Sequence, residues 1–468
     1  MMMDSRVRCW LSALTDAGYE AYLIGGAVRD FLLARVPGDY DVVTNARPEQ
    51  IKQIAVAHGW ICMSSRGERF GVVIIRVDAL EIETTTYRKE VYDREGYRPT
   101  RITYVSSLQE DVRRRDFTVN ALAMDEYGHI IDYVQGRDDL IARRLVTIGK
   151  PEQRLREDAT RILRACRFVG QLDFKVDAVL EAAIPTALSQ FRTISLAVVL
   201  REWEHIMRTA HVDKALALAW RTGVFSLMCR QRNKGIDRTV PFFTDEIGMV
   251  AKPGVFVAAV PPIEQAVLSL VVSVPPCGVV RYAALFYGLL RCYVFPSVGE
   301  KLTLPQVERG AAWVEKLLMY WQTSVSWKRR VWWLVFNHLR FSYFGKQLGK
   351  ALDPWLRREA RSAFFRTQQD WIEAVQQLCW LVMADSMMKD AVQTVLVPRE
   401  NAGTGMLAAA MKIPVSTRYL LYSKELVSIC GQKSGACLQA VLKQVQNGTL
   451  ENSRESVDRA IVQWLQRQ

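Results

Sequence analysis

Asp39 and Asp41 are two acidic residues one position apart, at the start of a short apolar run that continues through Val42 and Val43. Side chains alternate along a β-strand, so a strand here would place both carboxylates on one face, roughly 7 Å apart. Two carboxylates in that arrangement can hold one or two Mg²⁺ ions, which activate an attacking hydroxyl and stabilise a leaving pyrophosphate. The pair therefore indicates a metal site for nucleotidyl transfer, with a solvated strand end as the alternative interpretation.

A candidate phosphate-binding segment precedes the two acids. An apolar run at 22–24 stops at Gly25 and Gly26, and residues 27–33 have the composition of a short helix. Glycines let backbone N–H groups approach an anion, and a helix N-terminus favours phosphate through its free amides and its dipole. Arg29 can add a charge-assisted contact. The fingerprint G-x-G-x-x-G is absent, so this is not a dinucleotide site of that kind.

A second polar cluster is the segment RRDFTVNALA at 114–123. Its Asp116 can accept hydrogen bonds from sugar hydroxyls, and its Arg115 and Asn120 can donate to hydroxyl or phosphate oxygens. A charge run of this kind is often only a solvated face. Here the polar residues stand directly ahead of apolar ones, and together they predict a site for a ribose and a triphosphate.

A third candidate is the segment 154–168, which is predicted to form one continuous helix. Glu157 and Asp158 stand four and three positions before Arg161, so the three would share a face, and Arg164 follows three positions later. Cytosine and adenine each present an amino donor beside a ring-nitrogen acceptor, so one carboxylate and one guanidinium can satisfy both edges, whereas uracil and guanine reverse the pattern. Base reading and a salt-bridged surface helix are the two interpretations of this segment.

In this order, GGAVRD at 25–30, DYD at 39–41 and RRDFTVNALA resemble the signature of the nucleotidyltransferase superfamily, in its class II tRNA nucleotidyltransferase and bacterial poly(A) polymerase branch. The resemblance implies that Asp39 and Asp41 are catalytic residues and ligands of Mg²⁺. It also implies a third catalytic carboxylate at Glu83, because IETTTYR at 82–88 is similar to the family strand that carries it. Glu81 lies on the same face of that strand but does not match.

The segment EDATR at 157–161 is similar to the family's E-D-x-x-R motif. This similarity implies that Asp158 and Arg161 act as a protein template for CTP and ATP, and that Glu157 orients Arg161. The complete nucleotide-binding set implied by these motifs is Gly25, Gly26, Arg29, Arg115, Asp116, Asn120, Glu157, Asp158, Arg161 and Arg164.

The resemblance implies an enzyme that adds CCA to the 3′ end of tRNA from CTP and ATP and releases pyrophosphate. The polar segment 89–101 is expected to be a loop beside the site. Enzymes that add only the two cytidines lack part of this loop, and its full length here favours complete CCA addition. A poly(A) polymerase, a CC-adding or A-adding enzyme, and a non-catalytic RNA-binding protein with a decayed head are the alternatives.

The composition agrees with a polyanionic partner. The 468 residues carry 62 Lys and Arg against 49 Asp and Glu, a formal net charge of +13, which favours a polyanionic partner, with a membrane surface as the weaker alternative. The resemblance implies that this partner is the acceptor stem and 3′ end of tRNA. The nine cysteines form no C-x-x-C pair, so we expect reduced thiols and a cytoplasmic location. Neither a secretory signal nor an unbroken apolar span is apparent, so no membrane is expected. The sequence leaves the oligomeric state open.

The elements that must position these residues predict an α+β protein. Strands are expected at 60–63, 71–77 and 80–86, helices at 5–18 and 48–58, and a hairpin that turns at Gly128. From about residue 145 the pattern is almost wholly helical, which marks a domain boundary.

Together with the resemblance, this pattern predicts a small nucleotidyltransferase head with a mixed β-sheet, followed by all-α domains. The expected boundaries are 1–144 for the head, 145–210 for the neck with the base-reading helix, 211–335 for the body, and 336–468 for a tRNA-binding tail. The aromatic and basic residues at 328–333 are interpreted as a core with a charged rim, and the glycines at 431 and 435 as a turn that offers amides to a phosphate.

Overall fold

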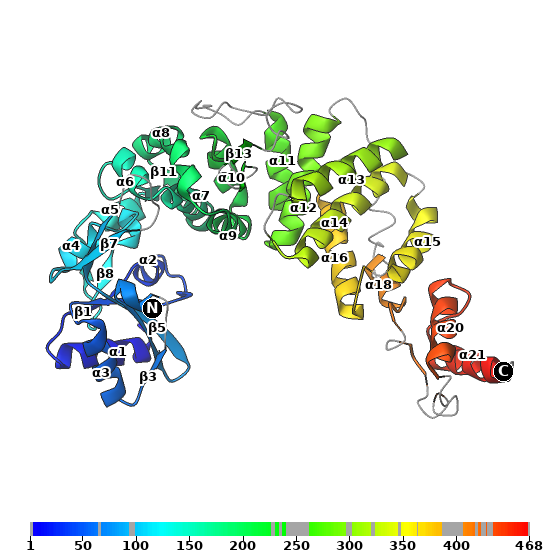
Figure 1. The fold of residues 1–468 in the computed structure, drawn as a ribbon, viewed down its shortest axis with the longest axis horizontal. Coiled ribbons are helices and arrows are strands. Elements are labelled where there is room, and N and C mark those ends of the chain that lie inside the picture. Colours follow the sequence, from blue (N-terminus) through cyan, green and yellow to red (C-terminus); the bar gives the residue numbers. More distant parts are fainter. Residues whose placement is uncertain are drawn as a thin grey trace. The chain divides into compact units, whose positions relative to one another are not determined.

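The computed structural model describes residues 3–63, 67–92, 99–225, 230–233, 236–239, 262–295, 302–319, 323–344, 348–362, 364–385, 406–416, 420–422, 427 and 434–466. The chain divides into two compact units, Met1–Val260 and Pro261–Gln468. The first unit holds a mixed β-sheet and the helices that follow it, and the described part of the second unit is helical (Figure 1).

The sheet of the first unit has seven strands in the order β3-β4-β5-β2-β1-β8-β9. Strands β2 and β5 run parallel and the other neighbours run antiparallel, so the sheet is mixed, as predicted. The strand bounds are β1 Ala21–Ile24, β2 Asp41–Thr44, β3 Ile61–Met63, β4 Val72–Val77, β5 Leu80–Thr86, β8 Ala123–Met124 and β9 Ile130–Ile131.

The sequence forms these strands and their covering helices because its apolar residues recur at the matching periods. In β4 the alternate residues Val73, Ile75 and Val77 are buried. The helices α1 (Ser5–Asp16) and α3 (Pro48–Ala57) lie against the sheet (Figure 1). Trp10 of α1 is fully buried and donates from Nε1 to Oγ1 of Thr84, at 2.8 Å, which fixes the helix over β5.

The segment 89–101 is not the simple loop that the sequence predicted, because both of its described ends belong to strands. Strand β6 (Arg88–Val91) pairs antiparallel with β7 (Arg101–Tyr104), and residues 93–98 lie outside the described part. In β6 the charged side chains of Arg88 and Glu90 hold the less exposed positions, and in β7 these positions are held by Ile102 and Tyr104. Glu90 is paired with Arg88 and with Arg114, both at 2.9 Å.

The segment 154–168 is not one helix, which is a second correction. Helix α6 (Pro151–Glu157) ends before Asp158, whose backbone is extended at φ −145° and ψ 100°, and α7 (Thr160–Leu172) begins two residues later. The Asp158 Oδ1 atom accepts from the Thr160 N–H at 2.9 Å and from its hydroxyl at 2.6 Å. This side-chain capping competes with the helical hydrogen bonds and breaks the helix between the two proposed base readers.

The remaining elements of the first unit are short connecting elements and a group of helices that pack on α6 and α7. Their bounds are α2 Gly26–Leu32, α4 Leu108–Val112, α5 Gly136–Ile141, β10 Arg144–Leu145, β11 Lys175–Val176, α8 Ala178–Ala187, α9 Leu196–Met207, α10 Val212–Arg221, β12 Arg230–Asn233 and β13 Ile236–Thr239. Helix α7 packs against both α9 and α10.

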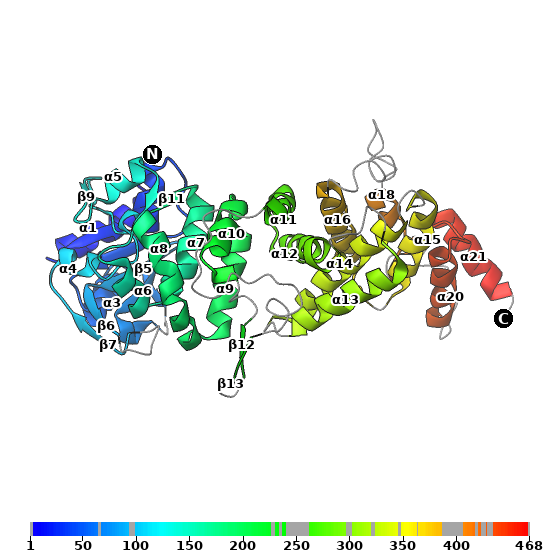
Figure 2. The same ribbon diagram turned by 90° about the horizontal axis from the view of Figure 1, so that it is seen from above.

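The described part of the second unit is built around aromatic side chains. Trp333, Trp355 and Trp371 are buried, while Arg329 and Arg330 lie over the rings of Phe364 and Phe365. The interpretation of 328–333 as core with a charged rim is therefore confirmed for these residues. In both views α12, α14 and α16 lie side by side (Figures 1 and 2). Residues 431–433 of the proposed phosphate turn lie outside the described part.

The helices of the second unit are α11 Pro262–Ser273, α12 Gly278–Leu289, α13 Leu304–Met319, α14 Val325–Phe344, α15 Leu348–Arg361, α16 Gln368–Ala384, α18 Met406–Met411, α20 Ser434–Gln446 and α21 Arg454–Gln466. Across the described ranges of the chain, no helix is both long enough and apolar enough to cross a membrane.

Candidate active site

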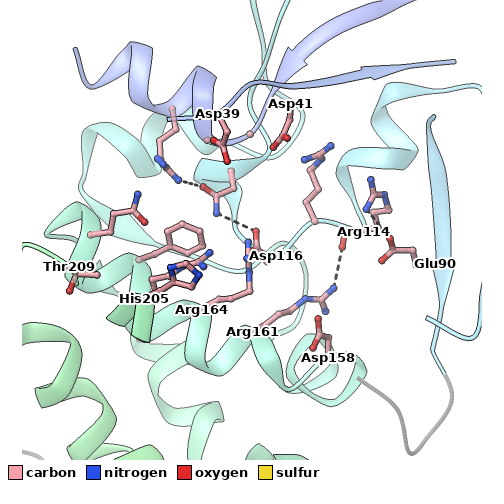
Figure 3. Close-up of a pocket in the computed structure, with 18 of the residues that line it drawn as sticks. Asp39, Asp41, Glu90, Arg114, Asp116, Asp158, Arg161, Arg164, His205 and Thr209 are labelled. Carbon is pink, nitrogen blue, oxygen red and sulfur yellow. Dashed lines mark hydrogen bonds and ion pairs between the residues drawn. The ribbon is translucent and has the colours of Figure 1, made fainter. Parts of the chain in front are cut away.

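A cavity of about 660 Å³ in the first unit collects most of the residues singled out from the sequence (Figure 3). Its walls come from the 25–41 segment, the β6 hairpin, the 114–120 segment, and helices α7 and α9. The predicted site residues that line it are Gly25, Gly26, Arg29, Asp39, Asp41, Arg115, Asp116, Asn120, Asp158, Arg161 and Arg164. Glu83 and Glu157 do not line the cavity themselves. Each of them contacts a residue that does.

The two glycines lie close to the side chains of the site. Gly25 has φ +80°, which favours glycine, and a Cβ there would lie 3.6 Å from Asp41 Oδ2 and 3.8 Å from Arg115 Nη1. A Cβ at Gly26 would lie 3.9 Å from Asp39 Oδ1. The Gly25 N–H donates to the Leu122 carbonyl at 3.1 Å, so this amide is engaged within the protein.

The carboxyl groups of Asp41 and Glu83 both have raised pKa values. Burial, followed by the charge of Glu83 and then that of Asp39, raises the pKa of Asp41 to about 6, against the opposing effect of Arg115. Glu83 stands opposite Asp41 in the parallel register of β2 and β5. The pKa of Glu83 is raised as well, first by burial of its carboxyl group and then by the charge of Asp39.

This donor set fits a divalent cation. The charges of Glu83 and Asp39 raise the pKa of Asp41, so these carboxylates repel when ionised, and a cation between them would relieve that repulsion. Carboxylate oxygens are the ligands that Mg²⁺ prefers. Among the described residues, no group of three or more His, Cys, Asp or Glu side chains is already arranged around one metal position. A cation would therefore draw on Asp39 and Asp41 together with substrate oxygens.

A row of hydrogen bonds crosses the centre of the cavity. Arg29 donates to Asn120 Oδ1 at 2.6 Å, Asn120 donates to Asp116 Oδ1 at 3.3 Å, and Arg164 donates from Nε to Asp116 Oδ2 at 2.7 Å. Burial acts to raise the pKa of Asp116, but the Arg164 guanidinium and the hydrogen bonds to its carboxylate hold it below its usual range. A sugar hydroxyl would have to share Asp116 with these protein donors.

The two proposed base readers are held in place on opposite sides of the helix break. Arg161, buried at 3% exposure, donates to the Arg154 carbonyl at 2.7 Å, to Glu157 Oε2 at 3.3 Å and to the Arg114 carbonyl at 3.2 Å. Glu157 thus contacts Arg161 as the motif implied. Both hydrogen bonds to the Asp158 carboxylate use Oδ1, and burial raises the pKa of this carboxyl.

Several lining residues were not anticipated from the sequence. Glu90, Tyr92 and Arg114 come from the hairpin side, and Arg167, Phe168, Gln171, His205, Arg208 and Thr209 come from α7 and the end of α9. The signal for the α7 residues is their spacing of three, four and seven positions from Arg164, which places them on one helix face. The α9 residues carry no such signal, because their proximity to α7 depends on tertiary packing.

Comparisons of the sequence with known proteins agree with this geometry. Residues 21–146 match the family model of the poly A polymerase head domain. The chain is 38% identical over 224 residues to the CCA-adding enzyme of Geobacillus sp. (strain WCH70), and 38% identical over 221 residues to that of Streptococcus pyogenes serotype M1. The matches cover 48% and 47% of this chain and 54% and 52% of the relatives. The chain thus spans about half the length of the curated relatives it matches.

Solved structures extend the likeness in fold over the whole chain. The crystal structure of the Bacillus stearothermophilus CCA-adding enzyme in complex with CTP aligns with a TM-score of 0.60 at 23% identity, covering 99% of this chain and 98% of that chain. The Thermotoga maritima CCA-adding enzyme complexed with tRNA aligns with a TM-score of 0.51 at 15% identity, covering 99% and 96%. At these identities the likeness concerns the fold.

Proposed function

We propose that this chain is a cytoplasmic tRNA nucleotidyltransferase that adds CCA to the 3′ end of tRNA from CTP and ATP. Its residues 21–146 match the family model of the poly A polymerase head domain. The observation that carries this proposal is that one cavity joins the Asp39 and Asp41 pair to the Asp158 and Arg161 pair. The first pair suits phosphoryl chemistry and the second suits recognition of a base edge, and a single nucleotide needs both.

The base would be selected by protein side chains alone. Asp158 Oδ2 would accept the exocyclic amino group of cytosine or adenine, and a free N–H of Arg161 would donate to the neighbouring ring nitrogen. Uracil and guanine present the opposite pattern and would leave a buried donor and acceptor unpaired, which is costly. The contacts of Arg161 with two backbone carbonyls fix its direction before the nucleotide binds.

The phosphates would lie between the base readers and the paired aspartates. Arg115, Arg29 and Arg164 line this region and can donate charge-assisted hydrogen bonds to phosphate oxygens. Asp39 and Asp41 would hold Mg²⁺, which when bound activates the attacking 3′ hydroxyl and neutralises charge on the leaving pyrophosphate. Glu83 would act on the site as a third negative charge beside Asp41.

The RNA partner follows from the same proposal. A chain with a net charge of +13 suits a polyanion, and the helical regions proposed as neck (145–210), body (211–335) and tail (336–468) would hold the acceptor stem of tRNA. A poly(A) polymerase is the second candidate, because the matching family model describes the head domain of that enzyme.

The products formed on RNA distinguish these functions. A tRNA transcript that lacks CCA would be incubated with the full chain, Mg²⁺, CTP and ATP, and its 3′ ends would be sequenced. We expect ends at CCA with both nucleotides and at CC with CTP alone. Long adenosine tails would instead assign a poly(A) polymerase, and ends at CC despite ATP would assign a CC-adding enzyme. Addition of A only to a transcript that already ends in CC would assign an A-adding enzyme. Asp41→Asn, without any incorporation, is the control for contaminating activity.

A further inference from the structure

Four arginines line one side of the cavity and continue from the paired aspartates to the surface. Three of them, Arg29, Arg164 and Arg167, surround the ring of Phe168, with guanidinium carbons 5.5, 5.2 and 4.9 Å from its centroid. The fourth, Arg208, follows α9 beside His205, and its side chain is 64% exposed. We call these four arginines the arginine row.

The wall of the cavity along this row is cationic although each arginine has an acidic partner. The partners are Asp30 at 2.8 Å, Asp116 at 2.6 Å, Glu202 at 3.2 Å and Glu204 at 2.9 Å, in the order of the row. Of these four acids only Asp116 belongs to the cavity lining. The other carboxylates lie behind the guanidinium groups, so an anion in the cavity meets the arginines first. The buried Nε of Arg167 also makes no hydrogen bond with any described group.

The row is separate from the base-reading corner. Figure 3 shows His205 and Thr209 on one side of Arg164, Asp158 and Arg161 on the other, and Asp39 and Asp41 above both. An incoming nucleotide that uses Asp158 and Arg161 would lie on one side of Arg164 and leave the side of His205 and Thr209 for the second reactant.

Resting on the proposed function, we infer that the outer arginines of the row, Arg167 and Arg208, bind the phosphodiester backbone of the single-stranded RNA 3′ end and guide its hydroxyl to Asp39 and Asp41, while Arg29 and Arg164 serve the triphosphate. A triphosphate is compact, and its charges lie beside the aspartates. A row of arginine side chains that extends to an exposed residue matches a nucleic acid, whose phosphate charges repeat along the chain. The Phe168 ring separates three guanidinium groups and attracts each of them, which lets like charges gather on one wall.

The test measures RNA affinity without requiring catalysis. A fluorescent RNA hairpin with a single-stranded 3′ end that lacks CCA would be titrated with the full chain at several KCl concentrations. Arg208→Gln should raise the Kd about tenfold at low salt and lower the slope of log K against log salt by about one, the signature of a lost phosphate contact. Arg167→Gln should act in the same direction.

Matched variants separate contact from structure. Glu204→Gln breaks the same ion pair as Arg208→Gln, yet it removes a negative charge, so RNA should bind as tightly or more tightly. A structural role for the pair predicts instead that both variants weaken binding. Arg221→Gln removes an arginine that is ion-paired and half-buried, with Glu181 at 2.9 Å, outside the cavity, and RNA affinity should not change.

Other outcomes would overturn the inference. If Arg208→Gln left the Kd for RNA unchanged and raised the inhibition constant of inorganic pyrophosphate, the row would hold the leaving group. If the row variants changed RNA affinity as described while wild-type protein added no nucleotide, the proposed function would fail and the RNA site would stand. Equal weakening by Arg208→Gln and Glu204→Gln would refute the inference directly.

Discussion

The carboxylate of Asp41 is placed where its negative charge costs free energy in the folded protein. Its pKa is raised from 3.8 to about 6 by burial, by Glu83 and by Asp39. Between these two values the folded state binds more protons than the unfolded state, so stability falls as the pH rises from about 4 to about 6. Above pH 6 the full cost is present, roughly 1–3 kcal/mol. The ionised Asp41 carboxylate therefore lowers the stability of the metal-free protein most above pH 6, and a bound cation would offset this cost.

Asp41→Asn should raise the stability of the metal-free protein while it abolishes nucleotide incorporation. The amide is a neutral group of the same size, so the melting temperature at pH 8 should rise by a few degrees. The gain should shrink toward pH 4, where Asp41 itself is neutral in the folded state. Thermal unfolding at both pH values with a chelator checks this. Glu81→Gln, which changes an exposed acid on the neighbouring strand β5, is the control. An equal gain at pH 4 and pH 8 would contradict the electrostatic origin.

At the scale of elements, the junction between α6 and α7 decides how the base readers are presented. Asp158 is extended and caps Thr160, while Arg161 is on the first turn of α7. A continuous helix would set these two side chains only by helical spacing. In the proposed function, the break would let the carboxylate and the guanidinium approach the same base edge from two elements.

Thr160→Ala should loosen the Asp158 carboxylate, because it removes the hydroxyl donor at 2.6 Å and keeps the backbone donor. We expect the free energy of unfolding to fall by about 1 kcal/mol and the KM for CTP to rise several-fold. Denaturant unfolding and steady-state kinetics measure the two effects. Thr222→Ala removes a buried hydroxyl that donates to the Leu218 carbonyl at 2.7 Å, away from the cavity. It should lower stability to a similar extent without changing KM, and a matching change in KM would argue against the positioning role.

The sequence predicted the elements whose burial follows a simple period. Strands β4 and β5 and helix α1 were located because apolar residues recur at two or at three to four positions. Strand β6 was missed because its less exposed side chains are Arg88 and Glu90, which form an ion pair instead of an apolar face. The break at Asp158 was missed because every residue around it tolerates a helix. Only the hydrogen bonds from Thr160 to the Asp158 side chain interrupt the helix.

The candidate site divides in the same way. Residues in compact motifs, such as Asp39, Asp41 and Asp116, were found because their types and spacing already indicate phosphate and sugar chemistry. His205 and Arg208 were not found, because α9 lies far from these motifs in the sequence and reaches the cavity only through its packing on α7. Gly25 was located correctly, but its N–H bonds to the Leu122 carbonyl, a long-range pairing that no local pattern reveals.

At the scale of the whole molecule, the two compact units have separate cores. The cavity and all of its lining belong to the first unit. A ligand that binds only the folded cavity stabilises that unit by mass action, by about 2.7 kcal/mol at one hundred times its Kd. Calorimetry should therefore resolve two transitions and show that CTP with Mg²⁺ raises only one of them. ATP with Mg²⁺ should shift the same transition, and a joint shift of both transitions would contradict independent units.

The most direct test of the account is whether protein side chains select the base. The full chain, a tRNA transcript lacking CCA, and equal concentrations of CTP and UTP would be combined with Mg²⁺, and the first added nucleotide would be sequenced. Wild-type protein should add C over U by about a hundredfold or more. Arg161→Lys keeps the charge but loses the fork of donors, and should bring the ratio toward one while nucleotide addition continues. A wild-type ratio in Arg161→Lys, or no preference in the wild-type protein, would contradict base reading by Asp158 and Arg161.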